Sequence, residues 1–516
     1  MRATSPMRAS MLSDWLAQRI ERNGEQPIYR QLHGLLQQAI LSRELPAGTK
    51  VPSSRLLASE LGLGRNTVTQ VYEQLALEGY VWSATGQGTF VADSAPDEIV
   101  GNDAIVSGVE PDIEPRVLSQ RGTRLLQGAG VSTRQEGAFM PGVPDVSRFP
   151  AAVWSRLQSK YWRRLRPDLL TYAPGGGLPK LRQVLADYLR TSRSVRCTPE
   201  QIIVTTGIHQ SIDLAVRLLT DSGDVIWTED PCYWGVRSVL QVSGLSMKAI
   251  PVDAEGINPS ADDLADPPKL MLVTPSHQYP LGMVMSLARR RMLLEFARQN
   301  GCWIIEDDYD SEFRYGSRPL ASLQGLDKDG QVIYVGSFGK TLFPGLRVGY
   351  IVVPEGLSAS FATASAELYR EGQLLQQAVL AEFIAEGHFT SHIRRMRGVY
   401  GQRRQIVLDT IRKRYGDTLQ IEGGDAGLHL VLRLPDGVDD RQVAKAALDV
   451  NVVVRPLSGY FLRPGREVSG LLIGYGGVPE DEIEPAFDRL TEVLSRYGVL
   501  PYQGLQDVSN VSPRSS

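Results

Sequence analysis

The segment SFGKTLFPGLR, residues 337–347, constrains the fold of this chain more than any other feature of its sequence. It follows an apolar run, residues 332–336, that has the character of a buried strand. Lys340 can form an imine with an aldehyde, and Ser337 and Arg347 can hold a phosphate group. These residue types, placed directly after a strand, predict a binding site for a cofactor that carries both an aldehyde and a phosphate.

Short apolar runs along the chain predict the sheet that would carry this site. They are residues 202–205, 225–227, 270–274, 303–306 and 332–335, and helical patterns separate several of them. This alternation predicts an α/β fold with a mostly parallel sheet that is covered by helices. Because ligands bind at the carboxyl ends of the strands in such sheets, the polar residues at those ends are candidate site residues.

Polar groups at the predicted strand ends complete the candidate cofactor site. Thr206 and Gly207 lie between a strand and a helix, whose free N–H groups would bind a phosphate. Tyr233 could stack on a flat cofactor ring, and Tyr309 could donate a hydrogen bond to the phenolic oxygen of that ring. Asp307 could keep a pyridine nitrogen protonated. Taken singly, these are equally an ordinary turn, a core tyrosine and a solvated acidic loop; their order along the chain favours pyridoxal 5'-phosphate (PLP).

A different pattern occupies residues 27–92. Residues 28–43 have helical spacing, Ser53 is placed to cap a second helix, and a glycine turn at 62–64 leads into a third helix. Two strand-like runs around residues 86–88 then predict a hairpin. Two helices joined by a glycine turn and followed by a hairpin predict a winged helix-turn-helix. The alternative is a small helical module for protein interaction with a solvated polar face.

The polar face of the third predicted helix is the candidate DNA-reading surface. Arg65, Asn66, Thr67 and Thr69 point away from the apolar stripe and could enter a major groove. Arg55 on the second helix is suited to phosphates. Because the net charge of the chain is −3, any DNA affinity must come from a local patch of this kind.

Together these motifs resemble known families. Residues 27–92 resemble the winged-helix domain of the GntR family, and residues 137–502 resemble fold-type I aminotransferases. The whole chain resembles the MocR/GabR subfamily of bacterial transcription regulators. The resemblance implies a homodimer, a cofactor site at the subunit interface and a smaller C-terminal α/β subdomain.

The resemblance also assigns roles to residues. Lys340 would form the covalent bond to PLP, and the cofactor site would consist of Thr206, Gly207, Tyr233, Asp307, Tyr309, Ser337, Lys340 and Arg347. The DNA contacts would be Arg55, Arg65, Asn66, Thr69 and the wing residue Gly88.

The remaining segments complete the expected organisation. Residues 1–26 are expected to be an N-terminal extension, and residues 503–516 a disordered tail. Residues 93–136 are expected to be a linker, because 93–115 hold many acidic residues and neither lysine nor arginine. The three cysteines are far apart and the histidines unclustered, so neither disulfides nor a metal site are expected. Without an apolar run of membrane-spanning length, the chain is expected to be cytoplasmic.

Leu472 departs from the aminotransferase pattern. Many of these enzymes have an arginine at this place in a late strand, where it holds the carboxylate of the substrate. Arg463 and Arg466 lie nearby in sequence and could substitute for it. A leucine at this place predicts at most slow or partial transamination, because it cannot form paired charge-assisted bonds to a carboxylate.

Two functions follow from this combination of parts. The first is a PLP-dependent transcription regulator that binds a double-stranded DNA operator and senses an amine, an amino acid or PLP. Such a switch requires that the effector binds one conformation better than another. The alternative is an active PLP-dependent aminotransferase with an accessory head domain.

Overall fold

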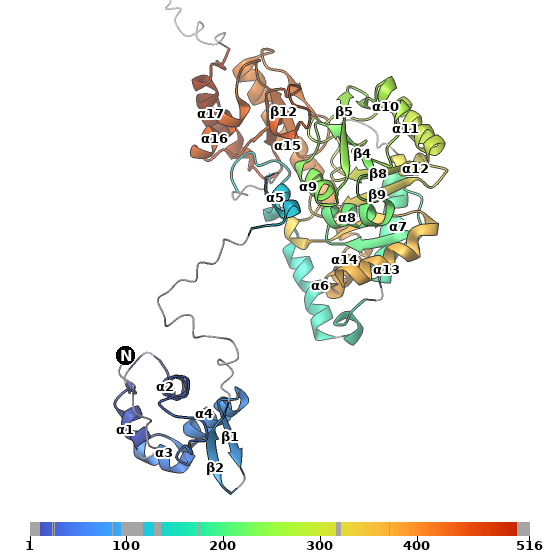
Figure 1. Ribbon diagram of the computed structural model, residues 1–516. Helices are drawn as coiled ribbons and strands as arrows, with labels where there is room; N and C mark the ends of the chain where they lie inside the picture. The colour runs from blue at the N-terminus through green and yellow to red at the C-terminus, as the bar shows by residue number, and fades with distance from the viewer. Residues whose placement is uncertain are drawn as a thin grey trace, which may run out of the picture. The chain divides into compact units, whose positions relative to one another are not determined.

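The computed structural model describes residues 11–22, 24, 26–84, 86–93, 117–127, 136–164, 166–173, 175–315, 321–370 and 372–502. The chain divides into two compact units, Met1–Val117 (blue in Figure 1) and Leu118–Ser516. Most of the predicted acidic linker and the whole predicted tail, residues 503–516, lie outside the described residues. Each unit has a hydrophobic core of its own.

The first unit is the winged helix-turn-helix that the sequence predicts. Its elements are α1 (Leu12–Ala17), α2 (Ile28–Leu41), α3 (Ser54–Leu61), α4 (Arg65–Leu77), β1 (Val81–Ala84) and β2 (Gly88–Val91). Ser53 caps α3 by accepting a hydrogen bond from the backbone N–H of Leu56. Gly62 ends α3 with φ of 61°, the left-handed conformation that lets the chain turn into α4. The wing is the antiparallel pair β1–β2.

The helix α1 extends the folded head beyond the predicted start at residue 27. Leu12 and Leu16 are fully buried in the same core as α2, α3 and α4. The Ser13 hydroxyl bonds the carboxylate of Glu60, and Arg22 donates to the carbonyl of Leu61 at 2.6 Å. This part of the expected N-terminal extension is therefore packed into the head.

The second unit is built around a large mixed sheet. Within the described residues this sheet has eight strands in the order β3-β10-β9-β8-β7-β4-β5-β6. The strands are β3 (Ile202–Thr205), β4 (Val225–Asp230), β5 (Ser246–Asp253), β6 (Gly256–Ile257), β7 (Leu270–Val273), β8 (Trp303–Asp308), β9 (Val332–Ser337) and β10 (Gly349–Val352). The pairs among β5, β4, β7, β8 and β9 are parallel, whereas β10 is antiparallel to β9 and β3. The prediction of a mostly parallel sheet is confirmed.

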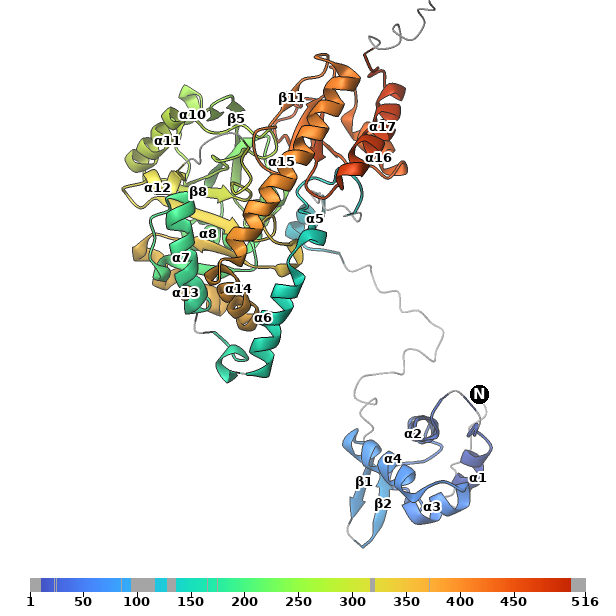
Figure 2. The ribbon, with the colours of Figure 1, turned by 180° about the vertical axis from the view of Figure 1, so that it is seen from behind.

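Helices cover both faces of this sheet (Figures 1 and 2). On β3, Ile202 and Val204 pack in a cluster with α7, whereas Ile203 packs in a cluster with α8, because side chains alternate along a strand. The helices are α6 (Ala151–Arg163), α7 (Pro179–Arg193), α8 (Ile208–Leu219), α9 (Trp234–Val242), α10 (Ala261–Ala265), α11 (Leu287–Asn300), α12 (Leu323–Leu326), α13 (Ser358–Tyr369) and α14 (Leu374–Ala385). A further helix, α5 (Gln120–Gln127), lies beside α9, inside the segment that the sequence indicated as a linker.

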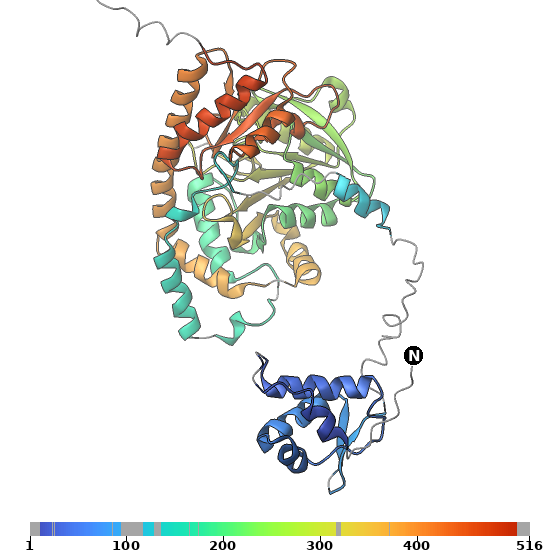
Figure 3. The ribbon, with the colours of Figure 1, turned by 90° about the vertical axis from the view of Figure 1, so that its left-hand side faces the viewer.

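A smaller α/β subdomain follows, as the resemblance implied. Its antiparallel sheet has the order β11-β12-β14-β13, formed by β11 (Ile421–Glu422), β12 (His429–Arg433), β13 (Arg455–Pro456) and β14 (Gly470–Gly474). Its helices are α15 (His388–Tyr415), α16 (Asp440–Asp449) and α17 (Glu480–Arg496). The long α15, orange in Figure 3, runs along one side of the unit.

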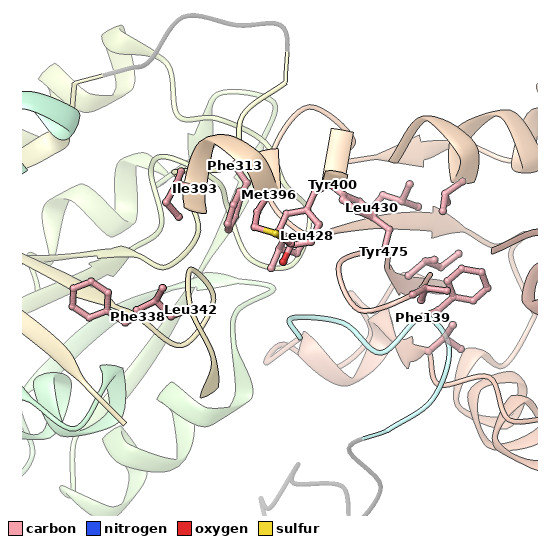
Figure 4. Close-up of a cluster of buried hydrophobic side chains, with 14 of the residues drawn as sticks. Phe139, Phe313, Phe338, Leu342, Ile393, Met396, Tyr400, Leu428, Leu430 and Tyr475 are labelled. Carbon is pink, nitrogen blue, oxygen red and sulfur yellow. The ribbon is translucent and has the colours of Figure 1, made fainter. Parts of the chain in front are cut away.

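Buried side chains join this subdomain to the large sheet (Figure 4). Met396 and Tyr400 of α15 lie between Phe313, which follows β8, and Leu428 and Tyr475, which flank the small sheet. The shared core fixes the small sheet against the carboxyl ends of the large one. None of the helices in the described ranges is long and apolar enough to span a membrane.

Candidate functional site

Lys340 lies in the turn that follows β9. Its Nζ donates a hydrogen bond to the carbonyl oxygen of Gly142 at 2.5 Å. Gly142 has φ of 73°, a conformation that favours glycine, and a Cβ atom at this position would lie 2.8 Å from the amine. Burial lowers the pKa of Lys340, while the charges of Asp310 and Asp307 act against that shift. A lowered pKa favours the neutral amine, the form that attacks an aldehyde.

Asp307 lies near the end of β8, and its side chain lacks a hydrogen-bond partner at one oxygen. The residue is 6% exposed, and Oδ1 is buried with no partner among the described residues. Burial raises the pKa of Asp307 to about 8, and the carboxylates of Asp308 and Asp310 add to the shift. A buried carboxyl without a donor fits a protonated ring nitrogen, which would supply both the missing hydrogen bond and a positive charge.

Tyr309 is held by His277, which Asp310 contacts in turn, and the sequence analysis singled out neither residue. Its hydroxyl lies 2.8 Å from Nδ1 of His277, and the same nitrogen lies 3.0 Å from Oδ1 of Asp310. His277 comes from the loop after β7, so no sequence spacing links it to Tyr309. The pair orients the phenol that the sequence assigned to the cofactor's phenolic oxygen.

Three of the predicted phosphate-binding residues lie together at the N-terminus of α8. Thr206 and Arg347 both line a cavity of about 600 Å³. Gly207, directly before α8, has φ of 129°, and a Cβ atom on it would lie 3.9 Å from Arg347 Nη1. Free N–H groups of a helix start beside a guanidinium favour a phosphate. Ser337 ends β9, and its Oγ accepts a hydrogen bond from the N–H of Gly339 at 3.2 Å.

Tyr233 lies directly before α9 and stacks on His209. The two ring centroids are 5.8 Å apart with an angle of 23° between the ring planes. His209 lines the same cavity as Arg347, and its Nε2 is buried without a partner among the described residues. Burial lowers the pKa of His209, and the charge of Arg347 adds to this effect. The sequence analysis missed His209, because only the structure shows its unpartnered nitrogen at this site.

The structure also locates the residues considered for carboxylate binding. Leu472 is fully buried in β14. Arg463 donates a hydrogen bond to the carbonyl of Ala249. It lines, together with Arg466, a cavity of about 720 Å³ whose lining includes neither Lys340 nor Asp307.

The predicted DNA-reading residues lie on α3, α4 and the wing. Arg65, Asn66 and Thr67 form the first turn of α4, and exposed Arg55 lies on α3. The side chains of Arg55, Arg65 and Asn66 are exposed, whereas those of Thr67 and Thr69 are half-buried. Exposed Gly88, on the wing, has φ of 116°, and a Cβ atom there would lie 2.7 Å from Cε of Lys50. These positions leave the polar groups of α4 open to a ligand in solution.

Comparisons with known proteins match both units. Residues 28–91 match the family of bacterial regulatory proteins of the gntR family, and residues 145–490 match aminotransferase class I and II. The probable rhizopine catabolism regulatory protein MocR of Rhizobium meliloti is 38% identical over 96% of this chain and 99% of its own length. The chain belongs to the MocR/GabR subfamily of GntR-family transcription regulators.

Other relatives of this MocR-type regulator agree with that assignment. The pyridoxine biosynthesis transcriptional regulator PdxR of Corynebacterium glutamicum is 32% identical, covering 87% of this chain and 92% of its own length. Among solved structures, the α-aminoadipate aminotransferase LysN of Thermus thermophilus, complexed with N-(5'-phosphopyridoxyl)-L-leucine, is 26% identical. The match has a TM-score of 0.64 and covers 74% of this chain and 96% of LysN.

PLP is the cofactor of the aminotransferase-like domain in this MocR-type regulator. The residues present fit it, since the domain offers a reactive amine, a buried carboxyl without a donor and a phosphate cradle. When bound, PLP supplies an aldehyde that bonds an amine and a ring that withdraws electrons from it. The chain itself is a DNA-binding transcription regulator.

Proposed function

We propose that this regulator senses an amine, an amino acid or PLP at the Lys340 pocket, and that occupancy of the pocket changes the affinity of the head for its operator. The observation that carries the proposal is the buried carboxyl of Asp307, whose Oδ1 has no hydrogen-bond partner among the described residues and whose pKa the charge of Lys340 lowers, in a chain that also has a DNA-binding head. Residues suited to bind PLP are thus present in a protein that acts by binding DNA. The effector acts by binding one conformation better than another.

Within this proposal, each predicted site residue has a role. Lys340 binds the aldehyde of PLP, Asp307 its ring nitrogen and Tyr309 its phenolic oxygen. Tyr233 stacks on the ring, and Thr206, Gly207, Ser337 and Arg347 hold the phosphate. In the head, the first turn of α4 enters the major groove and Arg55 contacts the backbone. The DNA contacts are Arg55, Arg65, Asn66, Thr67, Thr69 and Gly88.

A working aminotransferase is the second candidate function. The same retained pair, Lys340 and Asp307, favours it, because transamination uses a cofactor amine and a protonated ring. Leu472 argues against it, since a buried leucine offers a substrate carboxylate no charge-assisted hydrogen bond. We infer that turnover of common amino acids is at most slow, and that the chain acts as a homodimer carrying two heads.

Two measurements test the proposed function together. Borohydride reduction of the holoprotein, followed by peptide mass mapping, should place a pyridoxyl group on Lys340. In K328A, which removes an exposed lysine twelve residues upstream, the label should stay on Lys340. In a gel shift with DNA from upstream of the protein's own gene, the affinity should then change when PLP, or an amine added to the holoprotein, occupies the pocket. A label on another lysine, or DNA binding indifferent to PLP and to every amine tested, would contradict the proposal.

A variant and its control test the DNA-binding head in the same gel-shift assay. R65A should lower affinity for the upstream region by about 1–3 kcal/mol if the guanidinium contacts a base edge. R30A is the matched control, because Arg30 is an exposed arginine of the same unit on α2, away from the recognition turn. Equal losses in R65A and R30A would mean that the start of α4 does not read bases.

A further inference from the structure

Arg455 lies directly beside the position that lacks the expected arginine. In the small sheet, Arg455 of β13 is paired with Leu472 of β14, and Leu472 is paired on its other side with Val431 of β12. Residues directly opposite each other in antiparallel strands point to the same face of the sheet. The side chain of Arg455 therefore leaves the sheet on the same face as Leu472. Because the two residues are seventeen positions apart in sequence, only the strand register reveals this relation.

That face of the small sheet is turned toward the cofactor site. Leu472 and Val431 pack with Tyr460, with Trp234 at the start of α9 and with Tyr279 of the loop after β7. Tyr279 in turn contacts Tyr233 edge to face, with ring centroids 5.6 Å apart. The leucine at position 472 thus sits behind the aromatic side chains that border the proposed ring-binding site.

The guanidinium of Arg455 lies close to these same groups. Its Nη2 is 3.9 Å from the sulfur of Met140, two residues before the glycine whose carbonyl accepts the hydrogen bond of Lys340. Burial raises the pKa of Tyr233, Tyr279 and Tyr460, and the positive charge of Arg455 opposes that rise in each of them. Arg455 is thus within electrostatic reach of the tyrosines at the cofactor site.

Arg455 has no carboxylate partner among the residues that the structure describes. It is half-buried, and no ion pair links it to an acidic side chain in the part of the chain that the structure describes. Buried Arg403 of α15 shows the usual arrangement, since it lies 2.7 Å from Asp145 and 3.2 Å from Glu480. A half-buried guanidinium without an acidic partner among the described residues can bind an anion that arrives with a ligand.

We propose that Arg455 binds the carboxylate of the effector, which is therefore an amino acid rather than a simple amine. This inference rests on the proposed function, because it assumes that the effector amine reacts at the Lys340 pocket. A guanidinium offers a carboxylate two parallel hydrogen bonds and leaves the amino group free to face Lys340. Arg455 thus supplies from β13 the charge that an arginine at position 472 would supply from β14.

Because Arg455 would hold the carboxylate from the neighbouring strand, an amino acid can bind well and still react slowly. Neighbouring strands lie about 4.8 Å apart, so a carboxylate held from β13 is offset from one held from β14. A displacement of even about 1 Å from the reactive geometry can reduce a rate on the order of a hundredfold. An amino acid held by Arg455 is recognised through both its ends, but it is not aligned for rapid chemistry at its α-carbon.

The test compares matched ligands that differ only in the carboxylate. L-alanine with ethylamine, and L-phenylalanine with phenethylamine, are titrated into the holoprotein while the visible absorption of the bound cofactor is recorded. In the wild type the amino acid of each pair should bind on the order of tenfold or more tightly than its amine. R455M should lose this ratio, and R455K should keep part of it. R433M is the matched control, because Arg433 lies on β12 of the same sheet and faces Glu422 at 3.7 Å; it should keep the full ratio.

The outcomes separate this inference from the proposed function. Retained cofactor absorption in R455M shows that its pocket is folded, so loss of the ratio there supports the role of Arg455. An unchanged ratio in R455M, or a wild type that shows no preference for the amino acid in either pair, overturns the inference. Failure of the proposed function is a different result: the wild-type cofactor is then absent from Lys340, or its occupancy leaves operator affinity unchanged.

Discussion

The carboxyl of Asp307 gives the cofactor-free protein a pH-dependent stability. Burial and neighbouring acids raise its pKa from the ordinary 3.8 to about 8, so between these values the folded state binds more protons than the unfolded state. The free energy of unfolding therefore falls as pH rises through this window. D307N removes this contribution, because asparagine stays neutral and has nearly the same shape. The melting temperature of cofactor-free D307N should exceed that of the wild type by a margin that grows from pH 5 to pH 8.

The control for this prediction lies in the same strand. Glu306 is also buried with its pKa raised to about 7, but its carboxylate accepts hydrogen bonds from the N–H groups of Leu323 and Gln324 at 2.8 Å. E306Q should therefore destabilise the protein, since one of these acceptors becomes an amide donor. If the margin between D307N and wild type is the same at pH 5 and pH 8, the assigned protonation of Asp307 is wrong.

Individual residues differ in how far the sequence alone could predict their roles. Lys340 and Asp307 could be chosen as candidates, because Lys340 follows one buried strand, Asp307 lies near the end of another, and each has a residue type that only certain chemistry requires. His209 and His277 could not, because their roles depend on an unpartnered nitrogen and on a contact across separate loops. Arg455 could not either, since its relation to Leu472 arises from strand pairing. Contacts between distant segments leave no local pattern to read.

At the scale of elements, most buried strands and the mostly parallel sheet were predictable, but the antiparallel strand β10 was not. The strands β7 and β9 are short apolar runs, and such runs are typical of central strands. Strand β3 has the same signature although it lies at the edge of the sheet and pairs antiparallel with β10. Strand β5, which has only the two-residue β6 on its outer side, carries polar and half-buried residues, so it lacks that signature. Strand β10 is equally buried but runs antiparallel between β3 and β9. Periodicity reports which side chains are buried and says nothing about direction.

The short helix α1 illustrates the same limit and leads to a test. It has six residues, too few for a periodic pattern, yet Leu12 and Leu16 are fully buried in the core of the head. L16A should cost about 2–5 kcal/mol of head stability, because it leaves a cavity in a packed core. Hydrogen exchange in the full chain should speed up in α3, which α1 contacts. L77A is the control, since Leu77 of α4 is 84% exposed. Unchanged exchange in L16A would show that α1 is not needed for the head.

At the scale of the whole molecule, DNA affinity should depend on having two heads. One winged helix offers few cationic contacts, and the net charge of −3 adds no general attraction to DNA. In a homodimer, binding of the first head raises the effective concentration of the second, which gains affinity without any new contact. On DNA with both half-sites, the full chain should bind about 100-fold or more tightly than a fragment of residues 1–93.

The same pair of proteins on a single half-site decides whether this gain comes from the second head. There the full chain and the fragment should bind with affinities that agree within about threefold, because a second head has no site to occupy. Fluorescence anisotropy with the two DNAs at one fixed salt concentration measures all four affinities, and fixed salt is essential because phosphate contacts depend on it. An equal gain on both DNAs would mean that the large unit itself contacts DNA. No gain on either would contradict the dimer, and with it a switch that acts by changing how two heads engage one operator.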